Sequence, residues 1–333
     1  MRRRRLVGPA TLLAALTLAS CTPAPTSSSS APKTTAPASS TTATTSPPLK
    51  ISVVAADLGA SGIPPFYTPP QPLSPAAPGS LIRAELVTGV PGVPTGARLW
   101  RILYHSRTIY GADLAESGYV VAPAGPPPPG GFPVISWAHG TTGFSGICAP
   151  SLFTTEGGVG PYLIPGLAQY LRAGFVVAAT DYQGLGTAGI HPYLLGASEG
   201  RAVLDAARAS RRLPDLKTSD RVVIYGHSQG GQAALFAGEL APSYAPELHV
   251  LGVVAAAPAT NLSLIFSVAI GPLGQGILGF TLPAAYSWTR TYKDLPQSDV
   301  FTPAGARFAA STVTHGCLPA LEAAITSHHV TTA

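Results

Sequence analysis

The stretch of sequence that decides the fold covers residues 222–231 and reads VVIYGHSQGG. Its first four residues, Val222–Tyr225, are rich in the β-branched and aromatic side chains that are typical of a buried strand. Ser228 follows between Gly226 and Gly230, and residues 229–240 have the composition of a helix. The pattern predicts a sharp strand-to-helix turn that presents a serine hydroxyl.

A Gly-x-Ser-x-Gly turn between a strand and a helix is the nucleophile elbow of α/β-hydrolases. The glycines are expected because neighbouring backbone passes too close for a Cβ atom. The positive end of the following helix favours a developing oxyanion. We therefore predict that Ser228 is a catalytic nucleophile. The alternative is a glycine-rich turn in which the serine only caps the helix.

The residues around the elbow predict strands that alternate with helices. The expected strands are 100–104, 119–122, 133–137, 175–180, 221–225 and 250–257, with 108–110 as a further candidate, and the expected helices are 161–173, 199–212 and 229–240. Such alternation is typical of a parallel sheet with right-handed crossovers. We predict an α/β class protein with an α/β-hydrolase fold, which is a mostly parallel sheet with helices on both faces and an inserted cap.

A second motif, HGTTG at residues 139–143, directly follows the strand expected at 133–137. In α/β-hydrolases a loop of this type donates one N–H group to the oxyanion hole, and the residue after the nucleophile donates the other. We expect Gln229 to supply one donor and Thr141 the other, with Thr142 as the second choice. His139 and His227 are expected to have structural roles.

Several separated motifs, in order, resemble those of the secretory lipases of the lipase A type. They are SWAHGTTG (136–143), CAPS (148–151), TDYQGLG (180–186), HPY (191–193), EGR (199–201), the elbow and THGC (314–317). The resemblance covers roughly residues 81–321. It implies esterase or lipase activity on carboxylic esters and a cap inserted after the strand that ends near Ala257. It also implies a structural role for Asp181, because the family's triad acid comes later in the chain.

The resemblance further implies a disulfide between Cys148 and Cys317 that ties the oxyanion-side loop to the cap. An exported compartment permits such a bond, and the alternative is a pair of buried free thiols. The third cysteine, Cys21, is then left over. None of the three has the spacing of a metal site, so we expect neither a metal nor another cofactor.

The N-terminus has the features of an export signal. Four arginines, Arg2–Arg5, precede a short apolar stretch at 6–19, and residues 18–21 read LASC. This resembles the lipobox of bacterial lipoproteins, so we expect a signal peptide at 1–20 and lipidation at Cys21. The alternative is an ordinary secretory signal with a chance cysteine. The protein is therefore expected outside the cytoplasm, either secreted or anchored to the membrane.

The remaining composition fits a folded body on a tether. Residues 22–48 are rich in Ser, Thr and Pro, and we expect residues 21–80 to form a flexible tether followed by an irregular arm. The formal charge is +5, and removal of the four leader arginines leaves about +1. We therefore expect no basic patch for nucleic acid. The expected partners are an ester or lipid substrate and, through the N-terminal lipid anchor, a membrane.

The chain departs from the family pattern after the elbow. A serine hydrolase needs a histidine base and an acid that orients it, in the chain order Ser, acid, His. After the elbow we find no strand-like run followed by the expected acid. We therefore expect a core at 81–260 and a cap at 261–333, with the segment that carries the acid and the histidine missing. An open sheet edge should result. Asp294 or Asp299 with His315 keeps the order but lies in the expected cap, so we do not predict a triad there.

Three functions remain as hypotheses. The first is a serine carboxylic-ester hydrolase that forms an acyl-enzyme on Ser228 and is inactive or severely weakened without its acid and base. The second is a non-catalytic surface lipoprotein that keeps the fold as a binding module. The third is a peptidase or acyltransferase on the same scaffold.

Overall fold

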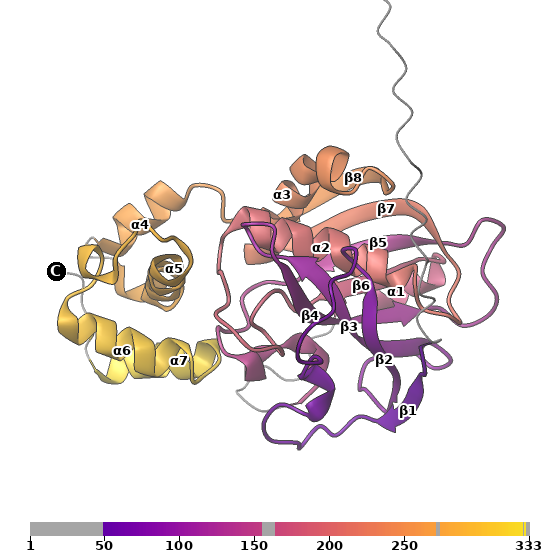
Figure 1. The fold of residues 1–333 in the computed structure, drawn as a ribbon, viewed down its shortest axis with the longest axis horizontal. Coiled ribbons are helices and arrows are strands. Elements are labelled where there is room, and N and C mark those ends of the chain that lie inside the picture. The colour runs from indigo at the N-terminus through magenta and orange to yellow at the C-terminus, as the bar shows by residue number, and fades with distance from the viewer. Residues whose placement is uncertain (1–48, 155–163, 271–273, 329, 331–333) are drawn as a thin grey trace, which may run out of the picture. The chain divides into compact units, whose positions relative to one another are not determined.

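A computed structural model of the chain describes residues 49–154, 164–270, 274–328 and 330. Eight strands form one mixed sheet with the order β1-β2-β3-β4-β6-β5-β7-β8 (Figure 1). The strands are β1 (Ser52–Ala55), β2 (Leu81–Thr88), β3 (Arg98–Arg107), β4 (Asp113–Ala122), β5 (Phe132–Ala138), β6 (Val176–Thr180), β7 (Thr218–His227) and β8 (His249–Ala256). Residues 1–48 lie outside the description, so the signal peptide, lipidation at Cys21 and the tether stay predictions.

The half of the sheet that carries the elbow is parallel. Strands β6, β5, β7 and β8 run in the same direction, as the alternation of strands and helices predicts. The connecting helices are α1 (Leu167–Arg172), α2 (Gly196–Ser210) and α3 (Gln229–Tyr244). In a parallel sheet all strands end at one edge, so the loops after β5, β6, β7 and β8 meet there.

Both faces of the sheet are buried along the central strands β5 and β6, and strand alternation distributes their side chains between the two faces. Along β5, Val134 belongs to the cluster that includes α2 and α3, whereas Ile135 and Trp137 belong to the cluster on the side of α1. The alanine-rich side of α2 is fully buried, with Ala202 and Ala206 at 0% exposure. Small side chains let α2 and α3 lie close together against the sheet (Figure 1).

Four further helices follow the sheet and form a helical region at 262–327. They are α4 (Leu262–Ile270), α5 (Leu278–Thr291), α6 (Pro303–Val313) and α7 (Leu318–Ser327). This region has its own apolar cluster, which also takes in Phe144 and Tyr193 from loops of the sheet. The indole N–H of Trp288 on α5 donates to the carbonyl of Tyr193 at 2.9 Å. Short 3-10 turns lie at Pro65–Tyr67, Gly146–Cys148, Pro150–Leu152, Gly274–Ile277 and Gln297–Asp299.

The N-terminal half of the sheet differs from the prediction. Strands β2, β3 and β4 form an antiparallel meander, and β4 also pairs antiparallel with β6. The candidate strand at 108–110 was wrong, because these residues form the turn of the β3–β4 hairpin. The arm before residue 81, expected to be irregular, contains the short strand β1. The strand β2 was not predicted. Of the helix predicted at 161–173, residues 167–172 are helical and 161–163 fall outside the described residues.

The predicted open sheet edge is present at β8. Within the described ranges, β8 pairs only with β7. Its exposed apolar side chains include Leu251 at 44% and Val254 at 51%. In the described ranges, β8 is therefore an edge strand with exposed apolar side chains.

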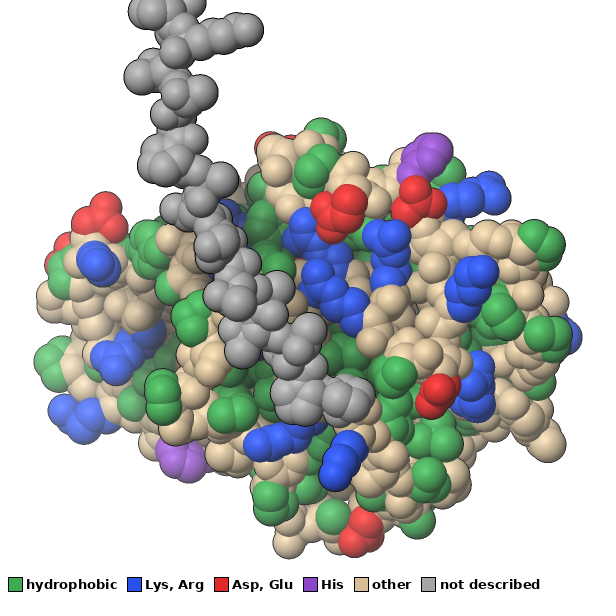
Figure 2. Space-filling model, turned by 45° about the vertical axis from the view of Figure 1, so that its right-hand side comes forward, with side chains coloured by type: hydrophobic (Ala, Val, Ile, Leu, Met, Phe, Trp, Pro, Cys, Tyr) green, Lys and Arg blue, Asp and Glu red, His purple; other side chains and the backbone are tan. Residues whose placement is uncertain are grey.

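Charged side chains are unevenly distributed over the surface. Figure 2 shows lysine and arginine side chains gathered on part of one face, with a few acidic side chains beside them. One surface hollow of about 650 Å³ is lined by four basic side chains and one acidic one, namely Arg98, Arg211, Arg212, Lys217 and Asp215. The expectation of no basic patch for nucleic acid stays a prediction, because a net charge does not give the distribution of charges. Among the described helices, none is long and apolar enough to cross a membrane.

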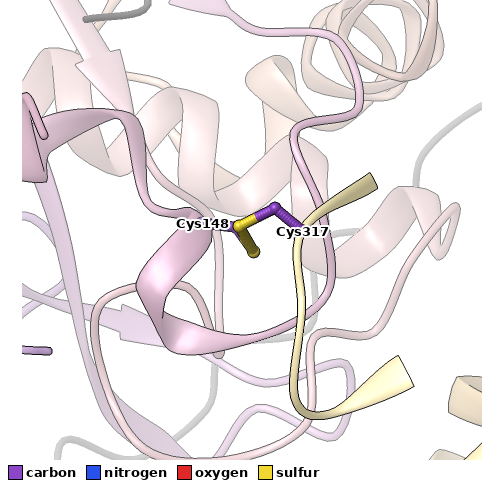
Figure 3. Close-up of a disulfide and its surroundings, with 2 residues drawn as sticks. All are labelled: Cys148 and Cys317. Carbon is purple, nitrogen blue, oxygen red and sulfur yellow. A yellow bond between two sulfur atoms is a disulfide. The ribbon is translucent and has the colours of Figure 1, made fainter. Parts of the chain in front are cut away.

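Cys148 and Cys317 form the disulfide that the family resemblance implied (Figure 3). Their Cα atoms are 5.4 Å apart, and 169 residues separate them in sequence. Gly143 lies against the bond with φ +154°, and a Cβ atom there would lie 2.4 Å from the Cys148 sulfur. The bond therefore joins the loop after β5 to the start of α7, and it leaves room only for glycine at residue 143.

Replacing Cys148 and Cys317 together by serine is expected to lower the free energy of unfolding by about 3 to 5 kcal/mol, because the crosslink closes a long loop in the unfolded chain. Denaturant titration with and without dithiothreitol measures this. Reductant should lower the midpoint of the wild type and leave that of the double variant unchanged. Equal midpoints for the oxidised wild type and the double variant would contradict the prediction.

Candidate active site

Ser228 occupies the predicted strand-to-helix turn between β7 and α3. Its backbone has φ 59° and ψ −119°, in a region that non-glycine residues rarely adopt. The strain is held by neighbouring backbone. The Ser228 N–H donates to the carbonyl of Ala256 at 2.9 Å, and the Ser228 carbonyl accepts from the N–H of Gln232 at 3.1 Å. The serine is half-buried, so its hydroxyl is not enclosed in the interior.

The two glycines of the motif are required by close backbone contacts. A Cβ atom on Gly226 would lie 1.9 Å from the carbonyl oxygen of Gly230. A Cβ atom on Gly230 would lie 1.9 Å from the carbonyl oxygen of Ala138, the last residue of β5. The elbow can therefore form only with glycine at both positions, and its start lies directly against the end of β5.

The 139–143 loop lies beside the serine, as the oxyanion-hole hypothesis requires. A Cβ atom built on Gly140 would be 3.6 Å from the Ser228 Cβ atom and 3.3 Å from the carbonyl oxygen of His227. The next residue, Thr141, shares a hydrogen bond of 2.7 Å between its hydroxyl and that of Tyr193. Gln229 follows the serine at the start of α3. The structure thus places the 139–143 loop and Gln229 next to Ser228, and the catalytic roles of Ser228, Gln229 and Thr141 stay proposals.

Thr142 is buried and connects the loop to the helical region. Its carbonyl accepts from the N–H of Leu318 at 3.0 Å, next to the disulfide. Its hydroxyl is buried and has no hydrogen-bond partner among the described residues. Because its backbone carbonyl is held by α7, Thr142 anchors the loop that carries Thr141.

The two histidines of the motifs have different surroundings. His139 is buried, its Nδ1 lies 2.6 Å from the carbonyl oxygen of Gly140, and burial lowers its pKa to about 4. It is therefore neutral at pH 7 and braces the loop. His227 is exposed, and its ring lies against Gly140. In the described part of the chain, no histidine is hydrogen-bonded to the Ser228 hydroxyl.

Asp181 is enclosed by hydrogen-bond donors away from the elbow. The Ser117 hydroxyl donates to its carboxylate at 2.6 Å, and the Ser151 N–H donates at 2.9 Å. Burial raises the pKa of Asp181 to about 6, against the lowering effect of these hydrogen bonds. These contacts support a structural role, since they join β4, the loop after β6 and the turn after Cys148.

Asp294 or Asp299 with His315, the combination that keeps the chain order of a triad, has no geometric support. His315 is exposed and its Nδ1 bonds the hydroxyl of Thr314, its neighbour in sequence. The Asp299 carboxylate accepts from Ser298, and Asp294 is exposed. No hydrogen bond or ion pair joins His315 to either aspartate in the ranges that the structure covers. Those ranges also hold no cluster of three or more His, Cys, Asp or Glu side chains that could bind a metal.

Sequence reasoning missed a buried polar network beneath the elbow. The side-chain amide of Gln229 bonds His191 Nε2 at 2.8 Å and Glu199 Oε1 at 2.7 Å. The Leu194 N–H also donates to Glu199 Oε1, at 2.9 Å. His191 and Glu199 stood in motifs of the family resemblance, but nothing in their spacing showed that they meet Gln229. The contact depends on the path of residues 183–195, which has no helix or strand to predict.

Chemically, the site offers a half-buried hydroxyl on a strained turn, with backbone amides of two segments close by. A hydroxyl in this setting suits nucleophilic attack on a carbonyl carbon, since nearby N–H groups can stabilise the oxyanion that forms.

Solved structures share the fold of this chain. Candida antarctica lipase A in its closed state superposes with a TM-score of 0.62 at 23% identity, covering 78% of this chain and 60% of that one. The esterase LipA from Xanthomonas oryzae gives a TM-score of 0.59 at 23% identity, covering 74% and 70%. The protein has an α/β-hydrolase fold.

The family model for secretory lipases matches residues 162–331. The chain belongs to the secretory lipase family.

Named relatives extend the comparison. "Lipase A" of Moesziomyces aphidis is 28% identical over 195 residues, covering 56% of this chain and 41% of that protein. "Lipase 5" of Candida albicans is 27% identical over 249 residues, covering 71% and 52%. A protein of Mycobacterium tuberculosis named a probable inactive lipase is 28% identical over 232 residues, covering 66% and 50%. The chain thus spans about half the length of these relatives.

The His191 network makes a pH-dependent contribution to stability. Burial lowers the pKa of His191 from 6.5 to about 3, so the unfolded chain binds a proton at this residue in the range where the folded chain does not. Stability from this group is present above pH 6.5 and is lost as the pH falls toward 3. Between pH 7 and pH 5 the stability difference between wild type and His191→Gln should shrink by about 2 kcal/mol. Denaturant titrations at matched pH measure it, and a constant difference would contradict the assignment.

Proposed function

We propose that the chain is a serine carboxylic-ester hydrolase that acts through an acyl-enzyme on Ser228. The observation that carries the proposal is the strained φ of 59° at Ser228, on a turn whose neighbours are the 139–143 loop and the N-terminus of α3. Such strain persists only where the surrounding structure enforces it, and it is common at reactive residues. Membership of the secretory lipase family supports the same activity.

In the proposed reaction, the Ser228 hydroxyl oxygen attacks the ester carbonyl carbon, and its proton passes to a water molecule that later returns a proton to the leaving alcohol oxygen. The carbonyl electron pair becomes an oxyanion, which accepts hydrogen bonds from the backbone N–H groups of Gln229 and Thr141, with Thr142 as the second choice for the loop donor. The tetrahedral intermediate expels the protonated alcohol and leaves an acyl ester on Ser228. Water then releases the acid. Each oxyanion donor contributes about 3 kcal/mol to the transition state.

The helical region suits substrates with an acyl chain. Helices α4, α5 and α6 surround an apolar hollow of about 550 Å³, whose lining includes Phe266, Leu282, Phe301 and Phe308. Helix α4 also exposes apolar side chains, Leu264 at 56% and Val268 at 40%. We therefore assign residues 81–260 to a catalytic core and 261–333 to a cap that contacts lipid, with triacylglycerols or shorter acyl esters as substrates.

The proposal includes export and anchoring. The arginine run, the apolar stretch and the LASC sequence ending at Cys21 support a signal peptide followed by lipidation. A disulfide at Cys148–Cys317 is consistent with an oxidising compartment outside the cytoplasm. The protein would then be either secreted or held at a membrane by acyl chains on Cys21.

A second function, that of a non-catalytic binding module, has its own observation. The Ser228 hydroxyl has no histidine partner among the described residues, and catalysis by a serine nucleophile normally needs such a base. One relative, from Mycobacterium tuberculosis, is named a probable inactive lipase. In this case the fold and the apolar hollow would bind lipid without hydrolysing it.

A fluorophosphonate probe separates the two functions. The purified chain should be labelled at Ser228, identified by peptide mass spectrometry, and Ser228→Ala should lose all labelling. Hydrolysis of p-nitrophenyl butyrate should fall to the buffer rate in the same variant. Ser311, an exposed serine on α6, serves as the matched control, because its hydroxyl bonds the carbonyl of Phe308 within the same helix. Absence of probe at Ser228 in folded wild-type protein would favour the binding module.

A further inference from the structure

The Gln229 side chain is fixed on both sides by buried partners. Its amide nitrogen carries two hydrogens, one directed at His191 Nε2 at 2.8 Å and the other at Glu199 Oε1 at 2.7 Å. His191 Nδ1 in turn donates to the carbonyl of Gln183 at 2.9 Å, so His191 Nε2 is free to accept. Gln229, His191 and Glu199 are each at most 1% exposed. The side chain therefore has a single satisfied orientation.

The same network connects to the loop on the other side of the serine. The His191 ring stacks on Tyr182 with centroids 5.8 Å apart and planes 19° apart. Tyr182 also contacts the His139 ring at 4.5 Å, and its hydroxyl donates to the carbonyl of His139 at 2.9 Å. Tyr182 has φ 72°, a strained value that the surrounding contacts hold in place. A continuous buried path thus runs from Gln229 to the 139–143 loop.

We propose that Glu199, His191 and Gln229 form a positioning network that holds the Gln229 N–H group toward the oxyanion, an inference that rests on the proposed esterase function. None of the three side chains needs to touch the substrate. Their effect passes through the backbone of Gln229, whose N–H belongs to the first turn of α3. A small displacement of such a donor weakens its hydrogen bond in the transition state.

The network gives the oxyanion hole a pH dependence. Burial raises the pKa of Glu199 to about 8, so it is neutral at pH 7 and ionises above that. The titratable groups that face it are His191, 3.8 Å away and neutral because burial lowers its pKa to about 3, and Tyr193, whose pKa burial raises. On its own helix, the Arg201 guanidinium bonds the carbonyl of Thr108. An ionised Glu199 would place a negative charge beneath the site where a second one develops.

The test measures the rate of fluorophosphonate labelling at Ser228 from pH 6 to pH 9.5. Glu199→Leu should slow labelling about tenfold at pH 7, and Glu199→Gln should restore most of that loss because its amide oxygen can accept the same bonds. The ratio of the wild-type labelling rate to the Glu199→Gln labelling rate should fall at least about threefold between pH 7 and pH 9.5, because Glu199 ionises in this range.

Gln232 provides the matched control on α3. It is the same residue type one turn further along, is 4% exposed, and bonds the carbonyl of Leu194 weakly at 3.4 Å. Gln229→Met should slow labelling about tenfold, and Gln232→Met by less than about twofold. Thermal unfolding of each variant shows whether it is folded. The Glu199→Gln and Gln232→Met comparisons remain decisive even if Glu199→Leu does not fold.

The outcomes separate the two proposals. No labelling of wild-type Ser228 overturns the esterase function, and the positioning network falls with it. The network alone is overturned by two results together. The labelling rate follows the same pH profile in wild type and Glu199→Gln, and Gln229→Met and Gln232→Met slow labelling equally. A pH-dependent ratio with a selective loss in Gln229→Met supports it.

Discussion

The close contact between the end of β5 and the start of α3 is the constraint on which the site depends. Parallel pairing of β5 with β7 places Ala138 opposite Gly226, and the backbone of Gly230 then lies against the Ala138 carbonyl. No side chain fits in this space. As a result the chain turns sharply at Ser228, and the loop that leaves β5 passes next to it. The strained φ of the serine follows from this arrangement of strands.

Two further connections hold the loop after β5 in that position. The disulfide from Cys148 to Cys317 and the bond from Leu318 to Thr142 fix it to α7 on one side. On the other side, ring contacts from His139 to Tyr182 and from Tyr182 to His191 link it to the buried amide of Gln229. The helical region and the sheet therefore both contribute to the geometry around the serine. A change at either connection should reach the site through the backbone.

The sequence predicted the parts of the fold that have strong local patterns. The elbow, β5 to β8 and the helices α2 and α3 could be predicted because apolar runs alternate with helical periodicity. The strand β2 was missed because its mixed polar and apolar residues have no clear pattern and its position depends on pairing with β3. The Glu199–Gln229 contact could not be predicted, since the two residues are 30 positions apart on helices α2 and α3, with the strand β7 between them. Contacts of this kind are decided by tertiary packing.

We propose that the Ser228 hydroxyl faces the backbone N–H groups of Gln229 and Thr141. A crystal structure of the chain after reaction with a small phosphonate tests it most directly. We expect a covalent bond to the Ser228 oxygen, with the phosphonyl oxygen about 2.7 to 3.1 Å from both main-chain nitrogens. A phosphonyl oxygen that points to solvent, or that contacts neither nitrogen, would show that these groups do not form an oxyanion hole.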